Sequence, residues 1–313
     1  MKKTLLSSIF LAANLFAGYN PYVICDKAPV PRAEPQKFQH TRNTIFSLGD
    51  ANHSGNDVIV AMGNDAEIPG KFAYGTFSKD ITGEAIEIYI DDCSGELVLL
   101  GADLTDHDGR TNYVISSWRL PKNPGQYKIV QRVLGDASYV VSYLRIVHQG
   151  SPIVVFDMDG TLSISNVEEI KEILFDHNPE SRRGAAELTR FWKNKGVEVV
   201  YLSGRHYVLT ALSRKDIVKS GYAPGTLLTS HGVSEWLPSK SHTGEYKYKE
   251  LMKLKNQGLL VQAAYGNEKT DVYAYLKAGI PKERVFVVGK RGGYQGTQAL
   301  GEDFVTHLRA IVQ

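Results

Sequence analysis

The clearest chemistry in the chain lies in two aspartates placed two residues apart in the stretch Asp157-Met158-Asp159-Gly160-Thr161. This stretch follows directly on the apolar run 153–156, which is typical of a buried parallel strand. One carboxylate of such a pair can attack phosphorus and form an aspartyl-phosphate. The other can protonate the leaving oxygen and later activate water. The pair therefore predicts phosphoryl transfer at the end of this strand.

A hydroxyl and an ammonium group follow later in the chain. Ser203, in Ser203-Gly204-Arg205, comes after the predicted strand 197–202, and its hydroxyl can hydrogen-bond a phosphoryl oxygen. Lys247 lies near the start of a predicted helix, where its ammonium would offset the charge of a phosphoryl group. Lys249 remains open as the alternative site lysine.

Oxygen donors for a metal follow the next predicted strand, 259–265. Asn267 and Asp271 lie there, and with the two aspartates they form a donor set that suits Mg²⁺. Each of these pieces alone is often only a turn, a loop or a solvated side chain. Their order at four successive strand ends favours one phosphoryl-transfer site, because single motifs seldom agree in this way by chance.

The elements that position these groups alternate between strands and helices. Strands are predicted at 153–156, 197–202, 227–229, 259–265 and 285–288, and helices at 185–195, 246–256, 271–278 and 303–312, with one more helix before residue 227. This alternation predicts an α/β domain, 151–313, with a Rossmann-like parallel sheet that binds ligands at the carboxyl ends of its strands. The stretches 163–184 and 205–247 leave no room for a large cap domain, so we expect an open site.

Residues 55–150 predict an all-β domain. Alternating or β-branched runs occur at 58–62, 85–90, 96–100, 127–133 and 139–147, separated by turn residues. Such spacing predicts a sandwich of immunoglobulin type. Asp103, Asp106 and Asp108 do not have the spacing of a calcium loop, so a polar turn is expected there.

The N-terminal residues predict export. Lys2 and Lys3, the apolar run 5–16 and Ala17 form the three parts of a signal peptide, 1–17, and an extended leader is expected at 18–54. No later segment could cross a membrane, so a periplasmic or secreted protein is expected. The two lysines account for the whole formal charge of +2, which does not indicate a nucleic-acid binder. Cys25 and Cys93 could pair in such a compartment, but a free Cys93 is equally compatible with the sequence.

Together these motifs resemble the four motifs of the haloacid dehalogenase (HAD) superfamily. The stretches that narrow this resemblance are 155–162, 201–205, 264–267, 270–275 and 279–281. They resemble the lipin-type domain, which occurs in lipin phosphatidate phosphatases and at the C-terminus of the membrane-associated phosphatidylinositol transfer proteins. Residues 124–127 and 135–136 resemble the β-sandwich that precedes this domain in the transfer proteins.

The resemblance implies roles for the matching residues. Asp157 is the implied nucleophile, and Asp159 is the implied general acid and base. The implied phosphate-binding residues are Thr161, Ser203, Gly204 and Lys247, and the implied Mg²⁺ ligands are Asp157, Asp159 through its main-chain carbonyl, Asn267 and Asp271. The expected function is an exported Mg²⁺-dependent phosphatase of a phosphomonoester, with phosphatidate at a membrane surface as the leading substrate. The alternative is a non-catalytic module that binds phosphatidate, because the transfer-protein relatives commonly lack the nucleophile that this chain keeps.

Overall fold

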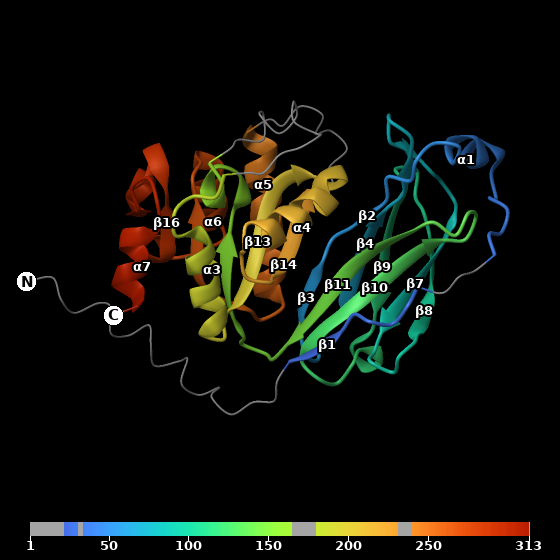
Figure 1. Cartoon of the computed structure of the whole chain (residues 1–313), viewed down its shortest axis with the longest axis horizontal. Helices are drawn as coiled ribbons and strands as arrows, with labels where there is room; N and C mark the ends of the chain where they lie inside the picture. The colour runs from blue at the N-terminus through green and yellow to red at the C-terminus, as the bar shows by residue number, and fades with distance from the viewer. Residues whose placement is uncertain (1–21, 31–33, 165–179, 231–239, 313) are drawn as a thin grey trace, which may run out of the picture.

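The computed structural model describes residues 22–30, 34–164, 180–230 and 240–312. An all-β unit and an α/β unit lie side by side, joined between residues 147 and 152 (Figure 1). The prediction of a β-sandwich followed by an α/β domain is therefore confirmed. The predicted signal peptide, 1–17, lies outside the described residues. So do 165–179 and 231–239, on which part of the prediction of an uncapped site depends.

A parallel sheet of six described strands forms the centre of the α/β unit, in the order β14-β13-β12-β15-β16-β17. The strands are β12 (Pro152–Phe156), β13 (Glu198–His206), β14 (Thr226–Ser230), β15 (Leu260–Gly266), β16 (Val285–Val287) and β17 (Gln298–Ala299). Residues 153–156 of β12 are fully buried, because their apolar side chains face helices on both sides of the sheet. The chain adds β13 and β14 on one side of β12 and then crosses to β15 on its other side, so the carboxyl end of β12 opens into the crevice where such sheets bind ligands.

Helices cover both faces of this sheet. On one face, α5 (Lys240–Asn256) and α6 (Lys269–Lys277) pack over Val155 and Val200. On the other face, α3 (Ala185–Asn194), α4 (Thr210–Lys219) and α7 (Val305–Val312) pack over Val154 and Phe156. The first of these cores also contains side chains of the all-β unit, namely Ile59, Ala61 and Val147. The two units therefore share one hydrophobic core.

The all-β unit is a sandwich of two sheets around the core of Ile68, Ile88, Ile115 and Ile129. One sheet has the order β3-β11-β10-β7-β8, and the other has the order β2-β4-β9. The bounds are β2 (Ser54–Gly55), β3 (Val58–Ala61), β4 (Ala66–Lys71), β7 (Ala85–Asp91), β8 (Leu97–Leu104), β9 (Arg110–Ile115), β10 (Gly125–Val133) and β11 (Tyr139–Val147). A small hairpin, β5 (Ala73–Tyr74) and β6 (Lys79–Asp80), stands beside them. β3 pairs with β11 in parallel, which differs from the purely antiparallel immunoglobulin arrangement.

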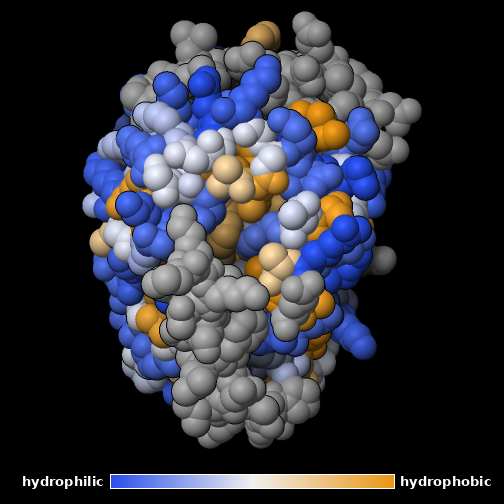
Figure 2. All heavy atoms as spheres, turned by 90° about the vertical axis from the view of Figure 1, so that its left-hand side faces the viewer, coloured by the Kyte–Doolittle hydropathy of each residue, from blue (hydrophilic) through white to orange (hydrophobic). Residues whose placement is uncertain are grey.

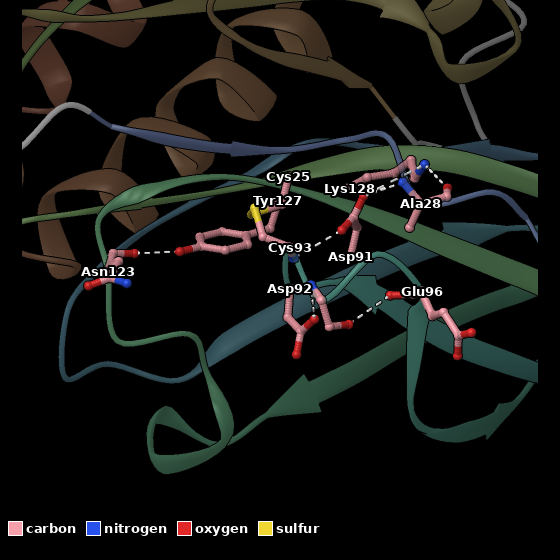
Figure 3. Close-up of a disulfide and its surroundings, with 10 residues drawn as sticks. Cys25, Ala28, Asp91, Asp92, Cys93, Glu96, Asn123, Tyr127 and Lys128 are labelled. Carbon is pink, nitrogen blue, oxygen red and sulfur yellow. Dashed lines mark hydrogen bonds and ion pairs between the residues drawn. A yellow bond between two sulfur atoms is a disulfide. The ribbon is translucent and has the colours of Figure 1, made fainter.

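The described part of the segment expected to be an extended leader, 18–54, packs on the sandwich. β1 (Val23–Cys25) pairs in parallel with β10, and the short helix α1 (Thr41–Phe46) lies at the far end of the sandwich (Figure 1). Cys25 and Cys93, whose pairing the sequence left open, form a disulfide (Figure 3). Beside it, Lys128 donates hydrogen bonds to main-chain carbonyls of residues 26 and 28. The segment is therefore anchored covalently and by a buried cation.

The outer face of the α/β unit, on the side of α7, is mostly hydrophilic, and its hydrophobic residues form separate patches (Figure 2). None of the helices that the structure describes combines the length and the apolar character that a membrane span requires.

Candidate active site

Asp157 sits at the carboxyl end of β12, where the sequence places it, and its carboxyl is almost completely buried. Its main-chain N–H donates to the carbonyl of Tyr265 on the neighbouring strand β15 (2.9 Å). The chain then turns sharply, and Gly160 has a φ of 72°, a value that favours glycine. This turn follows the two aspartates, whose carboxylates meet different partners.

Lys247 lies between two buried carboxylates. Its Nζ donates to Asp157 Oδ1 (2.5 Å) and to Asp271 Oδ1 (2.6 Å), and all three side chains are at most 6% exposed. Burial, together with the charge of Asp271, raises the pKa of Asp157 to about 7. Burial alone would lower the pKa of Lys247, but the two carboxylates outweigh it and raise this pKa. The cluster therefore holds two acids against one ammonium.

Asp271 and Asn267 close the same cluster from the start of α6. Asp271 Oδ2 accepts hydrogen bonds from the main-chain N–H groups of Asn267 (3.0 Å) and Glu268 (2.9 Å), which fix its orientation. The hydroxyl of Thr161 lies 2.7 Å from Asp157 Oδ2 and 3.0 Å from Asn267 Oδ1. The structure thus brings Asp157, Thr161, Lys247, Asn267 and Asp271 together.

Asp159 faces a different partner, Arg205, which sequence analysis did not assign to it. Arg205 Nε donates to both carboxylate oxygens (3.1 and 2.9 Å), and Nη2 donates to Oδ1 (2.7 Å). The other side of the same guanidinium donates to Asp216 Oδ2 (2.6 Å) and Ser213 Oγ (3.0 Å) on α4. Arg205 is only 1% exposed, so its charge is used within the protein and not on the surface.

Ser203 and Gly204 lie on β13, next to β12 in the sheet. Ser203 is fully buried, and its Oγ accepts a hydrogen bond from the main-chain N–H of Arg205 (3.1 Å). A Cβ on Gly204 would come within 2.8 Å of the Thr243 side chain on α5. Glycine at this position therefore permits the close approach of α5 that brings Lys247 to Asp157.

The other candidate lysine, Lys249, is exposed. Side chains two positions apart on a helix point to nearly opposite sides. Lys249 therefore points away from the site, because Lys247 points into it. It lines a groove against the sandwich together with Glu67 and Pro69. Lys247 is therefore the lysine of the cluster.

Arg182 has a structural role beside the site. Its guanidinium donates to the carbonyls of Gly160 (2.7 Å) and Thr161 (3.0 Å). It therefore supports the turn that follows Asp157 and Asp159.

The donor set of the cluster fits a hard divalent cation. Asp157 and Asp271 supply carboxylate oxygens and Asn267 supplies an amide oxygen, which are the ligand types that Mg²⁺ prefers. The excess of one negative charge over Lys247 also favours an added cation. Among the described residues no group of three His, Cys, Asp or Glu side chains gathers, so water and main-chain oxygen would have to complete the coordination.

Two family models match the two units of the chain. Residues 51–146 match the β-sandwich domain of PITM 1-3, and residues 154–289 match the LNS2 domain of PITM 1-3. The two units are thus similar, in this order, to a β-sandwich domain and an LNS2 domain, the latter a lipin-like domain related to the HAD superfamily. At this level the resemblance that the motifs indicated is confirmed.

Particular relatives share the same two-domain stretch. Membrane-associated phosphatidylinositol transfer protein 3 of Homo sapiens is 28% identical over 294 residues, which cover 91% of this chain and 29% of the relative. Protein retinal degeneration B of Drosophila melanogaster is 27% identical over 293 residues, which cover 91% of this chain and 22% of the relative. The chain therefore spans less than a third of the length of these curated relatives.

Solved structures are more distant. The cobalt-bound deoxy-D-mannose-octulosonate 8-phosphate phosphatase of Haemophilus influenzae is 17% identical and has a TM-score of 0.33, over 52% of this chain and 86% of that chain. A similarity at this level carries no conclusion about the chemistry.

Proposed function

We propose that this protein is a Mg²⁺-dependent phosphatase that hydrolyses a phosphomonoester through an aspartyl-phosphate on Asp157. The observation that carries the proposal is the buried cluster in which Lys247 bridges Asp157 and Asp271. A structural ion pair needs one carboxylate for one ammonium, and Asp271 already supplies one for Lys247. The cluster has a second acid, Asp157, at the carboxyl end of β12. An acid whose pKa is raised as strongly as that of Asp157, in such a crevice, is typical of active sites.

In the proposed reaction, a carboxylate oxygen of Asp157 attacks phosphorus, and the bond between phosphorus and the alcohol oxygen breaks. The alcohol oxygen takes its proton from Asp159. Water then attacks phosphorus and gives a proton back to Asp159. The bond between phosphorus and the Asp157 oxygen breaks, so inorganic phosphate is released and the carboxylate of Asp157 is restored. Lys247 stabilises the ionised form of Asp157, and Thr161, Ser203 and Gly204 are proposed to contact the phosphoryl oxygens.

Asp157, Asp271 and Asn267, with the main-chain carbonyl of Asp159, are the proposed Mg²⁺ ligands. When bound, the ion would neutralise charge that develops on the phosphoryl oxygens. Arg205 fixes the orientation of Asp159, since its guanidinium binds both carboxylate oxygens.

Phosphatidate at a membrane surface is the proposed substrate, because the domain is lipin-like and the relatives are named for membrane association and phosphatidylinositol transfer. The second candidate function is binding of phosphatidate without hydrolysis. The observation that favours it is the bidentate Arg205–Asp159 pair, in which Arg205 engages both carboxylate oxygens of the proposed acid.

We propose in addition that the protein is exported to the periplasm or secreted. The Cys25–Cys93 disulfide supports this, because disulfides persist mainly in oxidising compartments.

The test is release of inorganic phosphate from phosphatidate vesicles and from soluble phosphomonoesters, with and without Mg²⁺. We expect Mg²⁺-dependent release that Asp157→Asn abolishes, by ~10³-fold or more, while the variant unfolds like the wild type. Release restricted to sugar phosphates would refute the lipid substrate and keep the chemistry. Vesicle binding with no release from any ester would support the binding module instead.

A further inference from the structure

The all-β unit contributes two consecutive buried residues, Asn56 and Asp57, to the α/β unit. They lie between β2 and β3 and contact β14, the edge strand of the parallel sheet. Asn56 Nδ2 donates to the carbonyl of Thr229 (2.7 Å), and Asn56 Oδ1 accepts from the N–H of Thr229 (3.0 Å). The Leu227 N–H donates to Asp57 Oδ2 (2.9 Å). The sandwich therefore satisfies the open edge of β14, which would otherwise expose unpaired main-chain groups.

Asp57 also binds α4, the helix that carries the partners of Arg205. Arg214 donates to both oxygens of Asp57, with distances of 2.9 Å from Nη2 to Oδ1 and 3.1 Å from Nη1 to Oδ2. The hydroxyl of Ser54 lies 3.2 Å from that of Thr210, the first residue of α4. The position of α4 is thus fixed from the sandwich at its first residue and again one turn later.

The same helix holds Arg205. Ser213 and Asp216 lie on either side of Arg214 in sequence, and both accept hydrogen bonds from Arg205 Nη1 (3.0 and 2.6 Å). The opposite side of the guanidinium holds Asp159. Because a planar guanidinium fixes the geometry of both of its carboxylate partners, a shift of α4 has to move Asp159 or break one of these ion pairs.

We propose that Asp57 and Arg214 are positioning residues for Asp159, so that the all-β unit sets the orientation of the catalytic acid through α4 and Arg205. This rests on the proposed phosphatase function, and it assigns the sandwich a part in catalysis without contact with the substrate. A second ion pair between the units, Arg145 with Glu198 (2.9 Å), lies at the amino end of β13 and does not involve α4. The Arg145–Glu198 pair therefore supplies a matched control, since breaking it also removes an ion pair between the units but leaves α4 in place.

The test compares Arg214→Met with Arg145→Met, since each removes a cation from one ion pair between the units. p-Nitrophenolate leaves without a proton, whereas the alcohol of an alkyl phosphate needs one from the acid. The later attack by water also uses Asp159 and is common to both substrates, so release of the alcohol is measured within a single turnover. For Arg214→Met we expect this release to slow ~10-fold or more with an alkyl phosphate and by less than ~3-fold with p-nitrophenyl phosphate. Arg145→Met should change both by the same factor, and Arg214→Lys should restore part of the loss. Equal losses on both substrates in Arg214→Met would overturn the proposal.

A second readout does not depend on activity. The buried Nε–H of Arg205 gives an NMR signal, and we expect Arg214→Met to shift it and to accelerate its exchange with solvent, while Arg145→Met leaves it unchanged. An unchanged Arg205 signal in folded Arg214→Met would overturn the proposal. If the wild type hydrolyses no ester but the signal responds as expected, the phosphatase function fails and the coupling from the sandwich to Arg205 and Asp159 stands.

Discussion

At the scale of single residues, the cluster of Asp157, Lys247 and Asp271 shows how buried charges sustain one another. The ammonium of Lys247 offsets the charge of two buried acids, Asp157 and Asp271. Main-chain N–H groups donate further hydrogen bonds to Asp271. An isolated buried carboxylate would be several kcal/mol more costly than an exposed one. The arrangement therefore links the stability of the α/β unit to its chemistry.

Replacing Lys247 with Met should lower the free energy of unfolding by about 3 kcal/mol, because it leaves Asp157 and Asp271 without their counter-charge. Lys249→Met, on the same helix but exposed, should change it by less than about 0.5 kcal/mol. Equilibrium urea unfolding of both variants measures the difference. Equal effects would mean that Lys247 does not carry the stabilising ion pairs.

Much of this cluster could be predicted from the sequence, since Asp157, Asn267 and Asp271 follow strands whose carboxyl ends meet in a parallel sheet. The choice of Lys247 over Lys249 could not, because it depends on the rotation of α5 about its axis. The Arg205–Asp159 pair was missed because it joins residues 46 positions apart. Its signal was Arg205 itself, a charged residue near the carboxyl end of β13, the strand adjacent to β12.

At the scale of elements, several strands could not be predicted from the sequence, and β4 and β17 show why. β4 contains Pro69 and Gly70, and β17 has two residues. In β4, proline lacks the N–H that a strand ladder needs and glycine offers no side chain to pack. β17 is too short to show an alternating pattern. Tertiary contacts therefore decide that both segments form strands. By contrast, β11 has the predicted bounds, because nine residues of consistent pattern leave little choice.

β1 is three residues long, and the disulfide holds it to the sandwich. Cys25 and Cys93 are 68 positions apart, and a cross-link of that span stabilises a fold by about 4 kcal/mol through the unfolded chain. We therefore expect Cys25→Ser/Cys93→Ser to lose roughly that amount in guanidinium unfolding. Reducing agent should lower the stability of the wild type and leave the double variant unchanged. A wild type that does not respond to reduction would contradict the pairing.

At the scale of the whole molecule, the two units share a hydrophobic core and several buried polar contacts, so we expect them to unfold together. Two histidines are partly buried, one in each unit. Burial lowers the pKa of His53 and of His307 to about 4, from the usual 6.5.

Acid should therefore destabilise the protein. Between pH 6.5 and pH 4 the unfolded chain binds protons at His53 and His307 that the folded chain does not, whereas the folded chain binds one at Asp157 that the unfolded chain does not. The two histidines together outweigh Asp157, so the free energy of unfolding falls as the pH falls through this range. Thermal unfolding at pH 7, 5.5 and 4.5 measures this, and His53→Gln should flatten the dependence. His107→Gln, whose side chain is 85% exposed, should not. An identical pH dependence in all three proteins would contradict this account of His53.

The most direct test of the central claim is to trap the covalent intermediate on Asp157. The wild type is mixed with a substrate and Mg²⁺, quenched in acid within the first turnover, digested and analysed by mass spectrometry. We predict a phosphoryl group on the peptide that contains residues 153–156 and Asp157, with fragmentation placing it on Asp157. Phosphate release that leaves this peptide unmodified at every quench time, or a phosphoryl group on another residue, would contradict the account.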